Sequence, residues 1–475
     1  MMITRQFVIT LLALVALPLC GVSQELVDAP MAQPTKQQRV SEQGQQTPPS
    51  SQGSTSTQAT AGASMSLTLQ QAEEVAIKNN PQISAARLIA LASQQVTQQV
   101  RSALWPTASG EITGVDAESG RRISAVALNN PVIYSRAAAG AIVSQLITDF
   151  GRTANLIASA NYSAKAQNEN AVATQQQVLL AVNQAFYNAL QAQAVLTVAQ
   201  KTVDARQTVA SQVDALFRNK LKSELDLSFA NVNLAQAQLL LLDAQNNTSA
   251  TQATLSMVLG FPTVQNFRLV GNAGQLAPPP EDVDGLTSQA LSVRPEIRSL
   301  QFQYQGARKF QSAERDLLLP NIRALAAVGD TPTGDLQVAP NKSALSNTYG
   351  AVGANIEIPI FNGFLYQARA RDANLRAEAT QERLLDLRNL ISRDVRASWL
   401  NAKTAYQRMA VTQQLLQQAT LAMELAQARY HLGLSSIVEL TQAQLQLTQA
   451  EISDAQAGYD YQLSLAVLMY QTTGI

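Results

Sequence analysis

Apolar residues recur three and four positions apart over long stretches of this chain, a pattern that predicts α-helices packed along a continuous seam. In the clearest stretch, large and small apolar residues alternate at Leu227, Ala230, Leu234, Ala237, Leu241 and Ala244, and the series repeats at Leu440, Ala443, Leu447 and Ala450. The positions opposite the seam hold uncharged polar residues: Asn231, Gln236, Gln442 and Gln446. That polar face suits a water-filled lumen, although an ordinary solvated helix face explains it more simply.

Two long segments, 152–217 and 364–430, contain no proline and no glycine. At 1.5 Å per residue, each would be a helix of about 100 Å. Helices of ordinary globular domains average about three turns. The two segments therefore predict a coiled coil or a helical tube rather than a globular core.

Two short breaks interrupt these helical patterns, and they resemble each other. Ala428–Leu440 and Ala215–Leu227 align without a gap. Each has an aromatic residue, a short break, a serine, an acidic residue and then a new apolar run. We interpret both as the tips of helical hairpins.

The matching breaks are part of an internal duplication. Pro81 and Pro295 are separated by 214 positions (295 minus 81), and the same separation joins Ile83 to Ile297 and Pro106 to Pro320. Before the first of these prolines, Leu67 starts a helical pattern with Thr68 as a plausible N-cap. The chain is therefore predicted to contain two copies of one structural unit.

Non-helical sequence follows the second proline of each copy. The first strand-like runs are 107–115 and 321–329, the second are 140–150 and 349–361, and the expected loops between them are 116–136 and 330–347.

The clearest alternation of period 2 sets Ile356, Ile358 and Ile360 against polar neighbours. It fits a strand between lipid and a watery lumen, and it also fits a strand on a soluble sheet. Pro359 is expected at a strand end or an edge.

The N-terminus reads as a secretory signal peptide. Its apolar stretch, 7–19, is too short for a membrane-spanning helix. Small residues favour cleavage after Ser23. The alternative is cleavage before Cys20 with lipidation of that cysteine. A lipoprotein site normally has a small residue before the cysteine, and Leu19 stands there. Either cut exports the chain.

These signals divide the chain into five expected parts. They are a signal peptide (1–23), a disordered Gln/Ser/Thr/Pro-rich spacer (24–66), a first repeat (67–260), a linker with three consecutive prolines (261–284) and a second repeat (285–474).

Composition narrows the function. The formal net charge is +0, which leaves no basic footprint for nucleic acid. One cysteine and one histidine exclude metal clusters of these residues, disulfide frameworks and Cys/His nucleophile pairs. Without a Gly-rich phosphate loop or a nucleophile elbow, we expect no cofactor, no metal and no enzyme activity. After the signal, no apolar run is long enough for a spanning helix, so entry into a membrane would require a β-barrel.

The order of elements and the tip motifs, with Asn79-Asn80-Pro81 and Trp105-Pro106, resemble the TolC family of outer-membrane efflux proteins (outer membrane factors). The resemblance covers about residues 67–474. It implies a mainly α fold with a membrane β-barrel portion. Three subunits would each give four strands to a 12-stranded barrel, and the duplicated hairpins would form an α-helical tube through the periplasm.

The resemblance also implies the function and the partners. The homotrimer would be a passive exit duct in the cell outer membrane, in contact with outer-membrane lipid. A periplasmic adaptor (membrane fusion protein) and an inner-membrane pump, or a type I secretion system, would open it at the tips. Substrates would be drugs, metals, small metabolites or polypeptides.

Site residues follow by position within the family motif. Asp226, Glu439 and Tyr430 fall at gate positions, and Gln442 stands where a second acidic ring is expected. Ser435 replaces the family's basic gate partner. The expected adaptor contacts at the tips are Leu221, Ser223, Gly433, Leu434 and Ser436. Lys220 stands in place of the glycine of the first tip, which leaves the geometry of that turn open.

Three other classes of protein explain less of the sequence. A secreted structural or adhesive coiled coil without a barrel explains the helices but not the strand-like runs at matched places in both repeats. An adaptor has a helical hairpin, but two tandem hairpins without flanking β-rich domains argue against it. An enzyme is disfavoured by the motifs that the chain lacks.

Overall fold

The computed structural model describes residues 65–115, 136–271, 276–333 and 348–474. The expected signal peptide, the possible lipidation site Cys20 and nearly all of the spacer lie outside the described residues. So does most of the sequence between the strands of each repeat.

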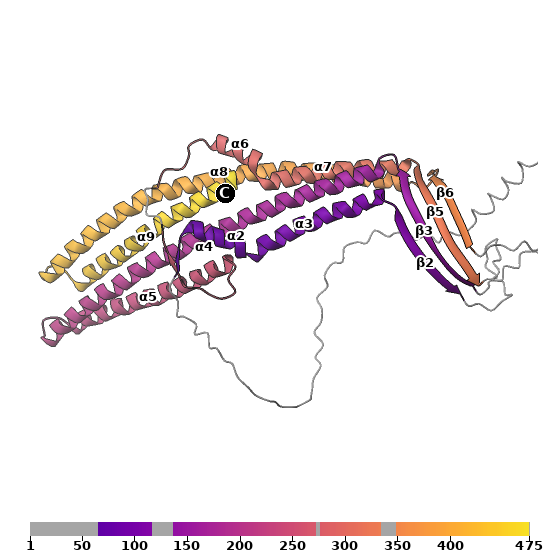
Figure 1. Ribbon diagram of the computed structural model, residues 1–475. Helices are drawn as coiled ribbons and strands as arrows, with labels where there is room; N and C mark the ends of the chain where they lie inside the picture. The colour runs from indigo at the N-terminus through magenta and orange to yellow at the C-terminus, as the bar shows by residue number, and fades with distance from the viewer. Residues whose placement is uncertain (1–64, 116–135, 272–275, 334–347, 475) are drawn as a thin grey trace, which may run out of the picture. The chain divides into compact units, whose positions relative to one another are not determined.

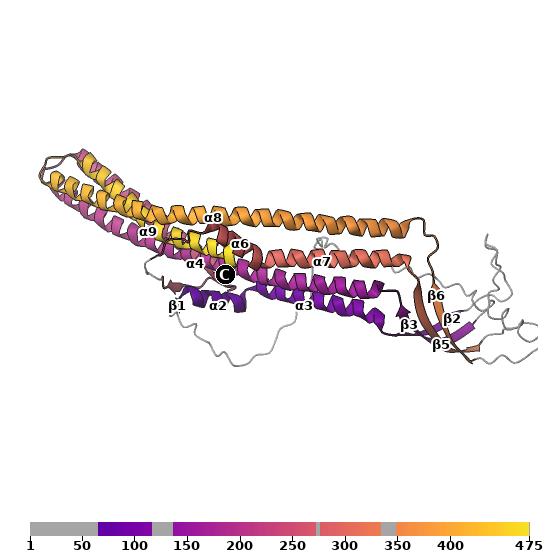
Figure 2. The ribbon, with the colours of Figure 1, turned by 90° about the horizontal axis from the view of Figure 1, so that it is seen from above.

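Two long helical hairpins contain most of the described residues. Helix α4 (Arg152–Arg218) returns as α5 (Glu224–Val258), and α8 (Leu365–His431) returns as α9 (Ile437–Thr473). In Figures 1 and 2, the turn between α4 and α5 and the turn between α8 and α9 lie at the same end. The long helices, the hairpins and the duplication are therefore confirmed.

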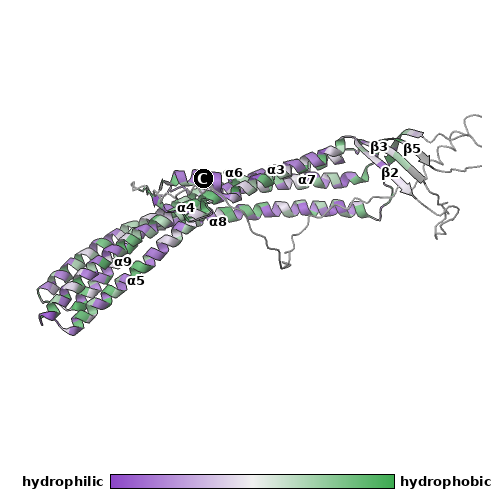
Figure 3. Ribbon diagram, turned by 60° about the horizontal axis from the view of Figure 1, so that its bottom comes forward, coloured by the Kyte–Doolittle hydropathy of each residue, from purple (hydrophilic) through white to green (hydrophobic). Residues whose placement is uncertain are grey.

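The predicted seam is present in the hairpins. Its small members are buried, namely Ala230, Ala237 and Ala244 on α5 and Ala443 and Ala450 on α9. Colouring by hydropathy shows apolar and polar residues interleaved along the helices of both hairpins (Figure 3). Among the described helices, none is both long and apolar enough to cross a membrane.

Shorter helices pack beside the hairpins. Helices α2 (Leu69–Asn79) and α3 (Pro81–Arg101) contact α4, while α6 (Val283–Val293) and α7 (Pro295–Arg315) contact α8. Short 3-10 turns, η1 (Ser102–Leu104) and η2 (Asp316–Leu318), follow α3 and α7. The expected N-cap of α2 is confirmed, since Thr68 Oγ1 accepts the Gln71 N–H at 3.4 Å and Gln71 Oε1 accepts the Thr68 N–H at 3.0 Å.

Four strands form one antiparallel sheet in the order β2-β3-β5-β6. They are β2 (Thr107–Val115), β3 (Arg136–Thr148), β5 (Asn321–Thr333) and β6 (Thr348–Glu357). All four strands were predicted, but only β2 has the predicted bounds. β3 covers 136–148 rather than 140–150, β5 ends at 333 rather than 329, and β6 covers 348–357 rather than 349–361, so Ile358 and Ile360 lie outside it. β5 runs four residues into the expected loop because Asp330 and Thr333 pair with β3. β6 ends at Glu357, two residues before Pro359, which has no N–H to donate to a ladder.

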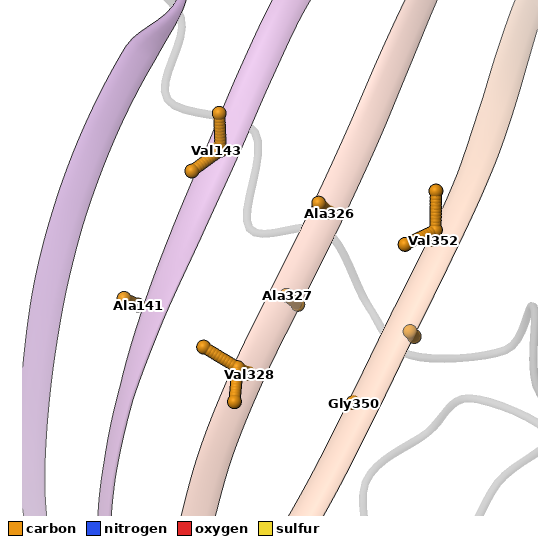
Figure 4. Close-up of a pocket in the computed structure, with 8 residues that line it drawn as sticks. Ala141, Val143, Ala326, Ala327, Val328, Gly350 and Val352 are labelled. Atoms are coloured by element: carbon orange, nitrogen blue, oxygen red, sulfur yellow. The ribbon is translucent and has the colours of Figure 1, made fainter.

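The two faces of this sheet differ in polarity. Side chains alternate across a strand, so the register places Ala141, Val143, Ala326, Val328 and Val352 on one face. They surround a shallow apolar hollow (Figure 4). The opposite face carries polar residues from all four strands, namely Ser109, Glu111, Ser144, Arg323 and Asn355.

A second, two-stranded parallel sheet was not predicted. β1 (Met65–Leu67) pairs with β4 (Phe267–Leu269), so Leu67 belongs to a strand and α2 begins only at Leu69. The helix thus starts within the expected stretch 67–72, after its predicted N-cap Thr68, while Leu67 itself belongs to a strand that was not expected. Leu67 is buried with Phe267 and with Phe186 of α4, and this packing is what favours the strand.

The returning long helix of each repeat ends in the same way. Gly260 and Gly474, 214 positions apart, follow α5 and α9 with φ values of +85° and +77°. The side-chain amide of Asn80 donates to the Val258 carbonyl at 2.8 Å, and at the equivalent position Arg294 Nη1 donates to Gln471 Oε1 at 2.7 Å. Each repeat thus ties the start of its second short helix to the end of its returning long helix.

Candidate functional site: the hairpin tips

The backbone makes the same turn in both tips. Lys220 has a φ of +61° and Gly433 a φ of +72°, both in the left-handed region. In the first tip, the Lys220 N–H donates to the Phe217 carbonyl at 2.8 Å and the Leu221 N–H to the Leu216 carbonyl at 2.9 Å.

The second tip repeats these bonds. The Gly433 N–H donates to the Tyr430 carbonyl at 3.1 Å, and the Leu434 N–H donates to the Arg429 carbonyl at 2.8 Å. This pair of bonds is the Schellman motif, which satisfies the last carbonyls of a helix. A lysine in place of glycine therefore leaves the turn of the first tip unchanged.

A serine caps the returning helix of each tip, but the acidic residue that follows it differs in role. Ser223 Oγ accepts the Asp226 N–H at 3.1 Å, and Asp226 Oδ2 accepts the Ser223 N–H at 3.1 Å and its hydroxyl at 2.7 Å. Ser436 Oγ accepts the Glu439 N–H at 3.4 Å, whereas the Glu439 carboxylate lies 3.5 Å from Arg429 Nε. Asp226 is thus engaged in a helix cap, and Glu439 closes its own tip by an ion pair.

The two tips touch through Tyr430. Its side chain is 6% exposed and forms a cluster with Ile437 and Leu440 of its own tip, and Val209 of α4 packs against this cluster. The ammonium nitrogen of Lys222, on the first tip, lies 4.0 Å from the centre of the Tyr430 ring. A cation over an aromatic face at this distance is attractive. Tyr430 therefore holds the second hairpin against the first.

Two hydroxyls of the second tip have no hydrogen-bond partner among the described residues. They are Tyr430 Oη and Ser435 Oγ, and both oxygens are buried.

The remaining predicted site residues lie at the surface of the tips. Leu221 and Leu434 are 70% and 67% exposed, and Gln442 is exposed on α9. The structure does not gather Gln442 with Tyr430. Lys222 and Arg429 were not assigned roles from sequence. Nothing local marks Lys222, because its contact depends on two hairpins far apart in the chain.

A buried arginine lies further along the same helices. Arg206 of α4 is buried against α9, where its guanidinium donates to Thr448 Oγ1 at 3.4 Å. Burial lowers the pKa of Arg206 to about 10, and the nearby Glu451 carboxylate acts in the opposite direction. Burial also raises the pKa of the Glu451 carboxyl, opposed by Lys201 and Arg206. The contact between the hairpins is thus partly polar.

Known proteins resemble this chain over both repeats. The family described as "Outer membrane efflux protein" matches residues 72–261 and 286–473. The pyoverdine export outer membrane protein OpmQ of Pseudomonas putida is 28% identical over 286 residues, which cover 59% of this chain and 58% of that protein. Outer membrane protein TolC of Escherichia coli is 22% identical over 301 residues, or 60% of this chain and 59% of TolC. The chain therefore aligns with less than two thirds of the length of these relatives.

Among solved structures, the Campylobacter jejuni CmeC outer membrane channel has the same fold. Its TM-score is 0.73 at 19% identity, covering 86% of this chain and 85% of that one. At this identity the likeness concerns the fold alone.

Proposed function

The chain belongs to the outer membrane efflux protein (TolC) family, and from that premise we propose that it is the exit duct of a tripartite efflux pump or a type I secretion system. It is an outer-membrane efflux channel and not an enzyme. Membership of this family argues against the alternative of a secreted structural or adhesive coiled coil. In the proposal the duct is passive and trimeric, it extends into the periplasm, and its gate lies at the hairpin tips.

The sheet supports a trimer. β2 and β6 are its edge strands, and each has one row of backbone groups without a partner strand among the described residues. One face of the sheet exposes apolar residues such as Val328 and Val352, while the other carries Glu111, Arg323 and Asn355 beside the apolar Ile142 and Leu325. Four strands from each of three subunits would close into a 12-stranded barrel with the apolar face in outer-membrane lipid and the polar face toward the lumen.

A single observation carries the proposed gate, namely the contact of Lys222 with Tyr430 between the two tips. Closure in this chain rests on that contact, on the packing of Tyr430, and on the ion pair between Arg429 and Glu439. Around a threefold axis, Asp226 and Glu439 would form rings of carboxylates at the mouth, which favour cations. Gln442 would add a neutral ring, and Ser435 leaves no basic partner for a lock between subunits.

The tips are also the proposed adaptor-docking surface. Leu221 and Leu434 expose most of their side chains at matching places of the two turns. The hydroxyls of Ser223 and Ser436 already cap helices. A helical hairpin of the periplasmic adaptor would therefore meet mainly the two leucines, with Gly433 allowing a close backbone approach. The inner-membrane pump would act through that adaptor.

The docking role is tested by Leu434→Asp, with Leu434→Met as the matched control. The exposed leucine contributes little to the fold, so both variants should form trimers in the outer-membrane fraction. The aspartate should abolish in-cell crosslinking to the periplasmic adaptor, whereas the methionine keeps it. Normal crosslinking of trimeric Leu434→Asp would remove the second tip from the docking surface.

A further inference from the structure

One tip residue has a left-handed backbone although it carries a side chain, which the turn does not require. Among the described residues, three that are not glycine have positive φ, and Lys220 is the one at a tip. The left-handed region is unfavourable for a residue that carries a Cβ. The second tip makes the same turn, with the same bonds, using Gly433. The duplication thus shows within one chain that glycine suffices here.

The Lys220 side chain has no role within the described part of the chain. It is exposed, and no carboxylate among the described residues lies within 4.0 Å of its ammonium group. The neighbouring basic residues, in contrast, each contact another side chain. Arg218 pairs with Asp214 at 2.8 Å, and Lys222 lies over the Tyr430 ring. The Lys220 charge is therefore free to meet a partner, beside the exposed apolar surface of Leu221.

We propose that Lys220 binds a carboxylate on the hairpin tip of the periplasmic adaptor, next to an apolar contact at Leu221. The inference rests on the proposed docking function and makes it specific. Each subunit then offers two unlike docking sites. The first tip selects an acidic partner by charge, and the second, with Gly433 in place of the lysine, selects by apolar contact and close approach. Retained strain at an exposed position is typical of a functional residue.

Lys220→Gly separates the two explanations of this residue. It removes the charge and also relieves the backbone strain. If Lys220 serves only the turn, the variant has a more stable tip and docks at least as well. On the proposal, the tip becomes more stable and yet docks less well. Slower hydrogen exchange of the Leu221 amide would report the stabilised turn independently of docking.

The experiment measures docking in intact cells that produce the full chain. A photo-crosslinkable phenylalanine analogue replaces the exposed Asn219, and the adaptor captured by the wild-type tip is identified by mass spectrometry. That adaptor is then the probe for every variant. Lys220→Arg should keep the crosslinked fraction within about twofold, and Lys220→Gly should lower it by about two- to fivefold. Lys220→Glu should lower it by more than about tenfold, because like charges then face each other.

Two controls make the result decisive. Exchange of the facing acidic residue of the adaptor for lysine should restore crosslinking to Lys220→Glu. Unchanged crosslinking of Lys220→Gly and Lys220→Glu, or no adaptor captured from Asn219, would overturn the proposal. If Leu434→Asp abolishes crosslinking to the adaptor while the Lys220 variants crosslink normally, only this inference fails. If Leu434→Asp also docks normally, the docking function itself fails.

Discussion

The ammonium nitrogen of Lys222 lies 4.0 Å from the centre of the Tyr430 ring, so a residue of the first hairpin tip rests on a residue of the second. The two positions are 208 residues apart (430 minus 222). Because Val209 of α4 also packs against the apolar cluster of Tyr430, Ile437 and Leu440, separation of the hairpins would break both contacts. The tip contact is therefore the place where opening of the duct would be opposed.

Lys222→Met should weaken closure. A cation–π contact contributes about 0.5–2 kcal/mol, so its loss should raise the open fraction of the channel several-fold, while the methionine keeps apolar packing on the ring. Single-channel recording in a planar bilayer measures this fraction. Lys309→Met on α7 is the control, because Lys309 is exposed and lies far from the tips in sequence. Equal open fractions for the two variants would contradict the role of Lys222.

Glu439→Gln should lower the cation preference of the channel without destabilising the fold. Its ion pair with Arg429 is exposed, with 43% and 57% of the two side chains accessible, so its loss costs under about 1 kcal/mol. The reversal potential under a KCl gradient measures the preference.

For the other acidic position, Asp226→Asn is the suitable variant, because alanine would also remove a helix cap and cost about 0.5–2 kcal/mol. A reversal potential unchanged in both variants would remove these carboxylates from the gate.

Gly260→Ala should destabilise the protein more than Gly474→Ala, although both glycines end equivalent helices. A Cβ on Gly260 would lie 2.6 Å from the backbone oxygen of Asn79, which cannot move freely. A Cβ on Gly474 would meet the amide of Gln176, the far end of a flexible side chain. We expect a cost of about 1–2 kcal/mol at Gly474 from the left-handed φ alone, and more at Gly260. Melting temperatures of the detergent-solubilised proteins test the order, and the reverse order would contradict it.

Glu451→Gln should stabilise the contact between α4 and α9 at neutral pH. Burial raises the pKa of Glu451 in the folded state. A carboxyl with a raised folded pKa destabilises the fold when ionised, and this cost disappears as the pH falls below its unfolded pKa. The variant should melt higher than the parent at neutral pH and at the same temperature near about pH 4. A variant that melts lower at neutral pH would show that attraction to Arg206 and Lys201 outweighs burial.

Local chemistry explains which features were predictable from sequence. The tips were predictable because helix ends and caps depend on short local motifs. The same motif occurs in both repeats, with Ser223 in the first and Ser436 in the second. The duplication was predictable because prolines can only stand at a few places in helices. The cap motifs and the spacing of the prolines can both be recognised without knowing which helices pack together.

Long-range contacts explain the rest. β1 and β4 are three residues each and carry no periodic signal, so their pairing follows only from packing against α2 and α4. The turn at Lys220 is not predictable from sequence because a lysine rarely adopts positive φ, and it is seen only in the backbone bonds of the folded tip. The contact of Lys222 with Tyr430 needs both hairpins in place.

The most direct test of the central claim is the conductance of the purified protein in a planar bilayer, with and without the tip contact. Wild-type protein and Lys222→Met are compared in the same membrane at the same protein concentration. The account predicts rare, small openings for the wild type and frequent, large, cation-selective openings for the variant. A wild type that already conducts as often and as strongly as the variant, or the absence of any conductance in both, would contradict a channel held closed at its tips.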